Sequence, residues 1–315
     1  MKSWGRALAT LVGLLALAGC DLLLPIEPVL TPQKRPAALE ELAAAPRATS
    51  EQSAKLRQYL REVQSSQLTQ GLLRKDGGAS DTTFTPDILA RNFEQIAFFN
   101  EYGSTTVQAG VSGNLRRWAK PIRVRVIFGP SVPPSQAEQD RADVAQYVAR
   151  LSRITGHPVS LVDGGANFIV FFVSEDDRAE TIDRFAPRLP GVTRTNLTPI
   201  RNLQDDVYCA VAAYASGLNA STYTAAVAVI RSENPDLLRL SCIHEELAQG
   251  MGLANDSPNA RPSIFNDDDE FALLTTHDEY LLNMLYDERL RPGLTLPQAQ
   301  PIVRILAREL LQGPL

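Results

Sequence analysis

The chain has 315 residues, of which 44% are hydrophobic, and it carries 31 basic and 36 acidic side chains for a formal net charge of −5. This apolar content is sufficient for a hydrophobic core, which excludes a disordered chain. The acidic balance, without any cluster of basic residues, predicts that nucleic acid is not a partner.

The first residues are typical of a secretion signal. Lys2 and Arg6 precede an apolar run, ALATLVGLLALAG, which ends directly before Cys20. The ending LAGC resembles the lipobox of bacterial lipoproteins, in which a diacylglycerol is attached to the cysteine and the preceding peptide is removed. A plain signal peptide or a transmembrane anchor is the alternative, but the run is shorter than the roughly 20 residues that span a bilayer. We therefore expect a signal peptide over 1–19 and lipidation of Cys20.

The segment 20–49 is rich in Pro, Ala and Leu, and we expect it to be a flexible, lipid-anchored tether. Without Lys2 and Arg6 the mature chain has 29 basic against 36 acidic side chains, a balance of −7. Asp21, directly after the lipidated cysteine, matches a retention signal of some enteric bacteria. We expect the protein at the periplasmic face of the cell envelope, with the inner membrane favoured over the outer one.

Residues 50–118 are expected to form an N-terminal helical region. Ser50 is placed to cap a helix whose apolar residues follow helical spacing: Leu56, Tyr59, Leu60 and Val63. In TPDILARNFEQIAFF, Thr85 as N-cap and Pro86 at the first helical position predict a second helix.

Residues 119–315 are expected to form the main domain, which ends in a C-terminal helix. The alternation in KPIRVRVIFG predicts a half-buried strand, and Ser135 with Glu138 predicts a capping box that opens a helix closed by Gly156. Further strands are expected at NFIVFFV, DVYCAVAAY and YTAAVAVI. Asn234 and Pro235 then start a helix that Gly252 ends. This order predicts an α+β fold with one mixed sheet.

That last helix carries the stretch SCIHEELAQGMGLANDS, residues 241–257. A zinc-protease helix places two histidines four residues apart beside a glutamate, but Ala248 stands four residues after His244. Shifted by one residue, the stretch has the spacing of H-E-x-x-H-x-x-G-x-x-H. The residues at those positions are Glu245, Glu246, Gln249, Gly252 and Asn255.

The stretch resembles the metzincin metallopeptidases, and so do two later segments. PSIFND places Phe265 where matrixin-type enzymes have the methionine of the turn beneath the metal, and TTHDEYLLNMLYDERL looks like the matrixin closing helix. The pattern EELAQGMGLANDS, SIFND and MLYDERLRPGL is more closely similar to the bacterial domain-of-unknown-function family 2927, whose members are often lipoproteins. The resemblance, over about residues 120 to 290, implies a zincin-like fold, degenerate at its metal ligands.

On a helix with 100° per residue, Glu245 and Glu246 lie about 40° and about 60° from Gln249, so all three project to one side. His244 lies about 140° from Gln249, on a stripe with leucines, and we expect it to be a hydrogen-bonded core group. We expect Glu245, Glu246, Gln249 and Asn255 to converge on one cleft, with the SIFND turn as its floor. His157 and His277 are expected at the surface.

Oxygen ligands of this kind disfavour zinc, and we expect no tightly held cofactor. Weak binding of Ca²⁺ or Mg²⁺, or of a cationic or hydrogen-bonding ligand, stays open. The run NDDDE, residues 266–270, lacks the spacing of an EF-hand loop and is expected to be a solvated acidic loop.

With Cys20 lipidated, Cys209 and Cys242 remain as a pair. In an oxidising compartment a disulfide is the simplest state of such a pair, and two separate buried thiols are the alternative.

Three functional hypotheses follow. The first is a non-catalytic, envelope-side binding module, a pseudoenzyme, whose partner is an envelope protein or peptide. The second is an active, peptidase-like hydrolase with a non-standard centre in which Glu246 is the general base. The third is a structural lipoprotein without a ligand site.

Overall fold

A computed structural model describes residues 49–99, 112–215, 220–266 and 268–312. The expected signal peptide, the lipidation site Cys20 and almost all of the expected tether lie outside the described residues. Within them, no helix combines the length and the apolar character that crossing a membrane requires.

One six-stranded sheet forms the centre of the structure. Its strands are β1 (Arg117–Trp118), β2 (Ile122–Phe128), β3 (Val159–Leu161), β4 (Phe168–Val173), β5 (Cys209–Ala215) and β6 (Thr222–Arg231). The strand order is β1-β6-β4-β2-β3 with all of these pairs parallel, and β5 adds to β6 in antiparallel orientation. The prediction of an α+β fold with one mixed sheet is confirmed.

The position of each long strand follows from its sequence. The strand β4 is an unbroken apolar run, FIVFFV, and all six of its residues are buried, as expected for a parallel strand covered on both faces. By contrast, β5 is half-buried along its whole length and pairs with β6 alone among the described strands. The sheet therefore has an antiparallel strand beside its longest parallel strand.

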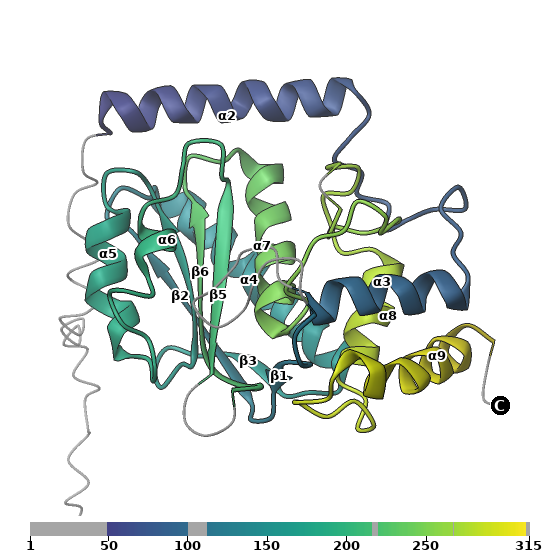
Figure 1. The fold of residues 1–315 in the computed structure, drawn as a ribbon. Coiled ribbons are helices and arrows are strands. Elements are labelled where there is room, and N and C mark those ends of the chain that lie inside the picture. The colour runs from purple at the N-terminus through teal and green to yellow at the C-terminus, as the bar shows by residue number, and fades with distance from the viewer. Residues whose placement is uncertain (1–48, 100–111, 216–219, 267, 313–315) are drawn as a thin grey trace, which may run out of the picture. The chain divides into compact units, whose positions relative to one another are not determined.

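Eight α-helices lie within the described residues. They are α2 (Glu51–Thr69), α3 (Pro86–Phe98), α4 (Pro134–Thr155), α5 (Arg178–Phe185), α6 (Thr198–Arg201), α7 (Asp236–Met251), α8 (Thr276–Leu285) and α9 (Leu296–Gln312), with a short 3-10 helix η2 (Ala186–Arg188) after α5. The helices α4 and α7 cover one face of the sheet, and α5 and α6 cover the other (Figure 1). Next to α4 and α7, α3 packs against α8 and α9.

The two faces of the sheet have separate apolar cores. Val170 and Phe172 of β4 point into the large core beneath α4 and α7. Ile169 and Phe171, the alternate residues of the same strand, point into the smaller core beneath α5 and α6. This division is the period-two alternation of a strand, with both sets buried.

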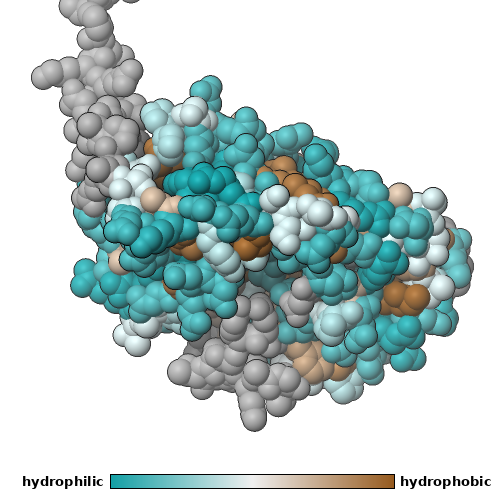
Figure 2. Space-filling view, turned by 90° about the horizontal axis from the view of Figure 1, so that it is seen from above, coloured by the Kyte–Doolittle hydropathy of each residue, from teal (hydrophilic) through white to brown (hydrophobic). Residues whose placement is uncertain are grey.

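The helix α2 lies apart from these layers. It crosses the carboxyl ends of the strands and the start of α7 at the top of Figure 1. Seen from above, this side of the molecule is mostly hydrophilic, with small separate hydrophobic patches (Figure 2). The predicted cap is confirmed, since Ser50 Oγ accepts a hydrogen bond from Ser53 N at 3.1 Å. Tyr59, which we expected on the apolar face, is 45% exposed.

Several local predictions have clear outcomes. Thr85 caps α3 as expected, and Gly156 ends α4 with φ of 64°. The capping box at Ser135 and Glu138 is wrong: the N-cap of α4 is Pro133, two residues earlier, and it makes no side-chain cap hydrogen bond. The strands β1 and β3 were not predicted, because two or three residues are too few to show a periodic pattern.

Candidate functional site

The candidate site is built on α7, which lies unusually close to the sheet. A Cβ atom on Gly250 would lie 2.5 Å from the ring of Phe168 in β4, so only glycine fits there. Trp118 Nε1 donates a hydrogen bond to the Gly250 carbonyl oxygen at 2.9 Å, which fixes β1 against the same turn of the helix. Close contact with two strands therefore sets the position of α7.

Gly252 ends the helix as predicted. Its φ is 131°, and a Cβ atom would lie 2.4 Å from the carbonyl oxygen of Arg116. Both the backbone conformation and the space require glycine at this position. The turn at Gly252 directs the following segment, which contains Asn255, away from the helix axis.

The carboxyl groups of Glu245 and Glu246 lie close together beside β5. One oxygen of each and the Cys209 sulfur are all within 4.8 Å of one another. Glu246 is only 3% exposed, whereas Glu245 is half-buried. The structure thus brings two of the four predicted residues into one group, on the side of α7 that faces β5.

Gln249 and Asn255 take part in a second set of contacts. The side-chain amide of Gln249 is buried and donates to Asp256 Oδ1 at 3.2 Å. Asn255 Nδ2 donates instead to backbone oxygens, to that of Gln95 in α3 at 3.2 Å and to that of Asp256 at 2.7 Å. Asp256 was missed by the sequence reasoning, although its place next to Asn255 in NDS was a usable signal.

His244 is a core residue, as predicted. It is buried, its ring stacks on Tyr147 of α4, and its Nδ1 accepts a hydrogen bond from Leu274 N at 3.0 Å. Burial, with a smaller effect from the Arg150 cation, lowers the pKa of His244 to about 3. The imidazole is therefore neutral and committed to a structural hydrogen bond on the side of α7 away from Gln249.

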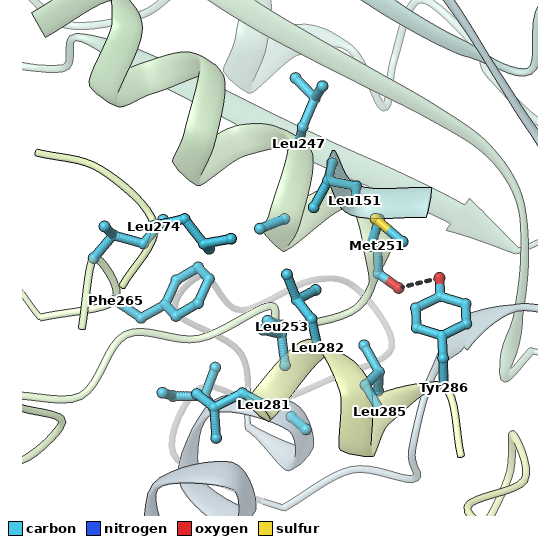
Figure 3. Close-up of a cluster of buried hydrophobic side chains, with 14 of the residues drawn as sticks. Leu151, Leu247, Met251, Leu253, Phe265, Leu274, Leu281, Leu282, Leu285 and Tyr286 are labelled. Carbon is cyan, nitrogen blue, oxygen red and sulfur yellow. Dashed lines mark hydrogen bonds between the residues drawn. The ribbon is translucent and has the colours of Figure 1, made fainter. Parts of the chain in front are cut away.

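Phe265 is fully buried in the apolar cluster of Figure 3, together with Leu253, Leu274, Leu282 and Met251 of α7. On a helix with about 100° per residue, Met251 lies about 160° from Gln249, on the opposite side of α7. The ring of Phe265 thus belongs to the apolar side of α7.

The SIFND turn that carries Phe265 is fixed by one buried carboxylate. Ser263 Oγ donates to Asp278 Oδ1 at 2.6 Å, and Ile264 N donates to Asp278 Oδ2 at 3.1 Å. The same Asp278 closes the capping box with Thr275 at the start of α8. The Asp278 carboxylate therefore holds this turn against the start of α8.

The predicted disulfide between Cys209 and Cys242 is present and joins positions 33 residues apart, with Cα atoms 5.9 Å apart. It links the start of β5 to the turn of α7 that precedes Glu245. Since its sulfur is oxidised, Cys209 is no thiolate ligand, and the chemically available donors of this group are the carboxylate oxygens.

One other prediction near the site is wrong, and two fail in part. His277 is fully buried, with its Nε2 3.0 Å from Asn92 Nδ2 and its ring edge-on to Phe84. The acidic loop is not simply solvated either, because Arg74 and Arg261 both donate to Glu270. The expectation for His157 fails in part, because its ring is half-buried and its Nε2 lies 2.9 Å from the Lys120 carbonyl oxygen.

Residues 86–305 match a protein family described as "Protein of unknown function (DUF2927)". The match runs from the start of α3 into α9 and covers the whole sheet, and so includes the candidate site, but it begins after α2. No curated protein matches the chain.

Proposed function

This chain belongs to the DUF2927 family, and we propose that it is a lipid-anchored protein of the cell envelope whose zincin-like domain is a non-catalytic binding module. The proposal joins the lipoprotein-like N-terminus to the group of oxygen donors beside β5. The location of the anchor, at the periplasmic face and on the inner membrane in preference, is part of the same proposal.

The observation that carries the proposal is the chemistry of the donors on α7. Glu245 and Glu246 form one group of carboxylates, Gln249 makes a separate contact with Asp256, and the one imidazole of α7 faces the core. A catalytic zinc ion is usually held by at least two nitrogen or sulfur ligands. The residues present do not fit that ion, so the proposed function includes no hydrolytic step through zinc.

Two acidic side chains in one partly buried group favour a positively charged ligand. We propose that this ligand is a lysine or arginine side chain of an envelope protein or peptide. A hard divalent cation such as Ca²⁺ has the same preference for oxygen ligands and is the alternative ligand of the same group.

The test is isothermal titration calorimetry of the mature protein. One series uses lysine- and arginine-containing peptides as the ligand, and a separate series uses CaCl₂. Glu246→Gln should weaken peptide binding at least tenfold, while Glu138→Gln, which removes an exposed carboxylate of α4, should leave it unchanged. Elemental analysis should find no stoichiometric zinc. Stoichiometric zinc that is lost on His244→Ala would overturn the proposal.

A second candidate is a hydrolase in which Glu246 is the general base. The burial of Glu246 beside a second carboxylate favours it, because a carboxylate shielded from water is the usual form of such a base. Turnover of peptide or peptidoglycan-like substrates that disappears in Glu246→Gln would favour this candidate over the binding module.

A further inference from the structure

The helix α2 is held against the strand ends by polar contacts and by two buried leucines. Arg57 Nη1 donates to the Ser232 carbonyl oxygen at 2.9 Å, and Gln64 Oε1 accepts from Leu238 N at 3.1 Å. Leu56 and Leu60 are its buried apolar residues, and neither is a member of the two cores that cover the sheet. The contacts of α2 are therefore separable from the packing of the sheet.

The chain after α2 has the features of a hinge. Gly71 has φ of 80°, with open space around its Cα, and Leu73 also has a positive φ of 57°. Immediately afterwards the chain is fixed again, since Leu73 N donates to the Asp269 carbonyl oxygen and Arg74 N to that of Glu270. Rotation near Gly71 would move α2 and leave the remaining structure in place.

Beneath α2, at the carboxyl end of β6, lies the buried carboxyl group of Glu233. It is 1% exposed, and its Oε1 accepts hydrogen bonds from Ser53 Oγ of α2 at 2.7 Å and from Glu175 N at 2.8 Å. Its Oε2 is buried and has no hydrogen-bond partner among the described residues. An ionised carboxylate with one unsatisfied buried oxygen costs more free energy than the neutral acid in the same place.

The charged groups next to Glu233 are Arg57 of α2, Arg231 of β6 and Glu175 of the segment after β4. Arg57 in turn lies near Arg61 of the same helix, Asp176 after β4 and Arg239 of α7. Arg231 and Arg178 both donate to Glu175, and Arg239 donates to Asp140, so these guanidinium groups are directed to other acids. Burial raises the pKa of Glu233, and its hydrogen bonds and the charge of Arg231 offset this only in part.

We propose that α2 is a strap that closes over the strand ends when Glu233 is protonated and opens when Glu233 ionises. In the closed form the proton resides on the carboxyl group, and on opening it passes to solvent while the carboxylate becomes hydrated. The pKa of Glu233 is higher in the closed form than the ordinary 4.5. The helix α2 should therefore be fully closed below pH 4.5 and should open as the pH rises through the pKa of the closed form.

This inference is independent of the proposed binding function. Since α2 precedes the residues that match the family, opening requires no change in the family's own domain. It would uncover the carboxyl ends of β4 and β6, which is the edge where open parallel sheets commonly bind ligands.

Hydrogen exchange followed by mass spectrometry tests the strap. In the intact protein, the protection of peptides from α2, corrected for intrinsic exchange rates, should fall by up to tenfold per pH unit above pH 4.5, while peptides from α4 keep theirs. Glu233→Gln should remove this pH dependence. Glu62→Gln, on the outer side of α2, should retain it.

Protection of α2 that does not change with pH, or a pH dependence that survives in Glu233→Gln, would overturn the proposal. Ser53→Ala provides a second variant in case Glu233→Gln does not fold. It removes the hydrogen bond from α2 to Glu233 and should lower the protection of α2 at every pH; unchanged protection would also contradict the strap.

Discussion

The imidazole of His244 and the phenol ring of Tyr147 stack face to face, with ring centroids 4.0 Å apart and an interplanar angle of 9°. The same Tyr147 donates from its hydroxyl group to the His244 carbonyl oxygen at 2.8 Å. The contact ties α4 to α7 directly behind the candidate site. It also explains why the histidine beside the motif glutamates has a structural role.

His244→Ala should lower the free energy of unfolding by about 2–4 kcal/mol, because it opens a cavity and leaves the Leu274 amide without its acceptor. Tyr147→Phe, which keeps the stacked ring and removes one hydrogen bond, should cost only about 1 kcal/mol. Urea titrations would measure both values. An equal loss of stability in the two variants would contradict the larger contribution expected from the imidazole.

Stability should decrease in acid because of His244. Its pKa is about 3 in the folded protein and 6.5 ordinarily, so its contribution is complete above pH 6.5 and is lost progressively as pH falls towards 3. The slope from this one group is about 1.4 kcal/mol per pH unit in that window. Denaturation of His244→Gln, which does not titrate, should show a correspondingly shallower pH dependence.

The disulfide should contribute about 3–4 kcal/mol to stability, because it closes a loop of 33 residues in the unfolded chain. The Cys209→Ser/Cys242→Ser double variant should lose that amount in thermal or urea unfolding. Dithiothreitol should destabilise the parent protein and have no further effect on the double variant. Two reactive thiols in the denatured, unreduced parent would contradict the bond.

Gly252→Ala should destabilise by about 3 kcal/mol or more, because the new methyl group would meet the Arg116 carbonyl oxygen at 2.4 Å in addition to the strained φ. Gly156→Ala is the matched control. That residue also has a positive φ but open space around it, so its substitution should cost only about 1 kcal/mol. Similar losses at the two positions would show that the close approach to Arg116 has no energetic effect.

Cys20→Ala should abolish membrane attachment and leave an unprocessed or soluble precursor, if lipid holds the protein to the membrane. Fractionation with immunoblotting measures this, and Asp21→Ala, which keeps the lipid, should remain attached. Equal membrane retention of Cys20→Ala would contradict lipid anchoring.

Elements with strong local signals could be predicted from the sequence alone. Apolar runs such as FIVFFV fixed the long strands, and side-chain caps at Ser50 and Thr85 fixed two helix starts. The register of α7 also predicted that His244 would turn away from Gln249, since helical geometry is local. The pairing of Cys209 with Cys242 was the simplest expectation once Cys20 was assigned to lipidation, with two separate thiols as the alternative.

Contacts between distant segments could not be predicted in this way. Helical spacing cannot show that Asn255 donates to α3, that Asp256 is the partner of Gln249, or that His277 is enclosed by Phe84 and Asn92. The same holds for Glu233, whose burial depends on a helix 180 residues earlier in the chain. Asp256 is only seven residues from Gln249 but lies beyond the end of α7, and the other contacts join residues far apart in the chain, so the folded packing brings them together.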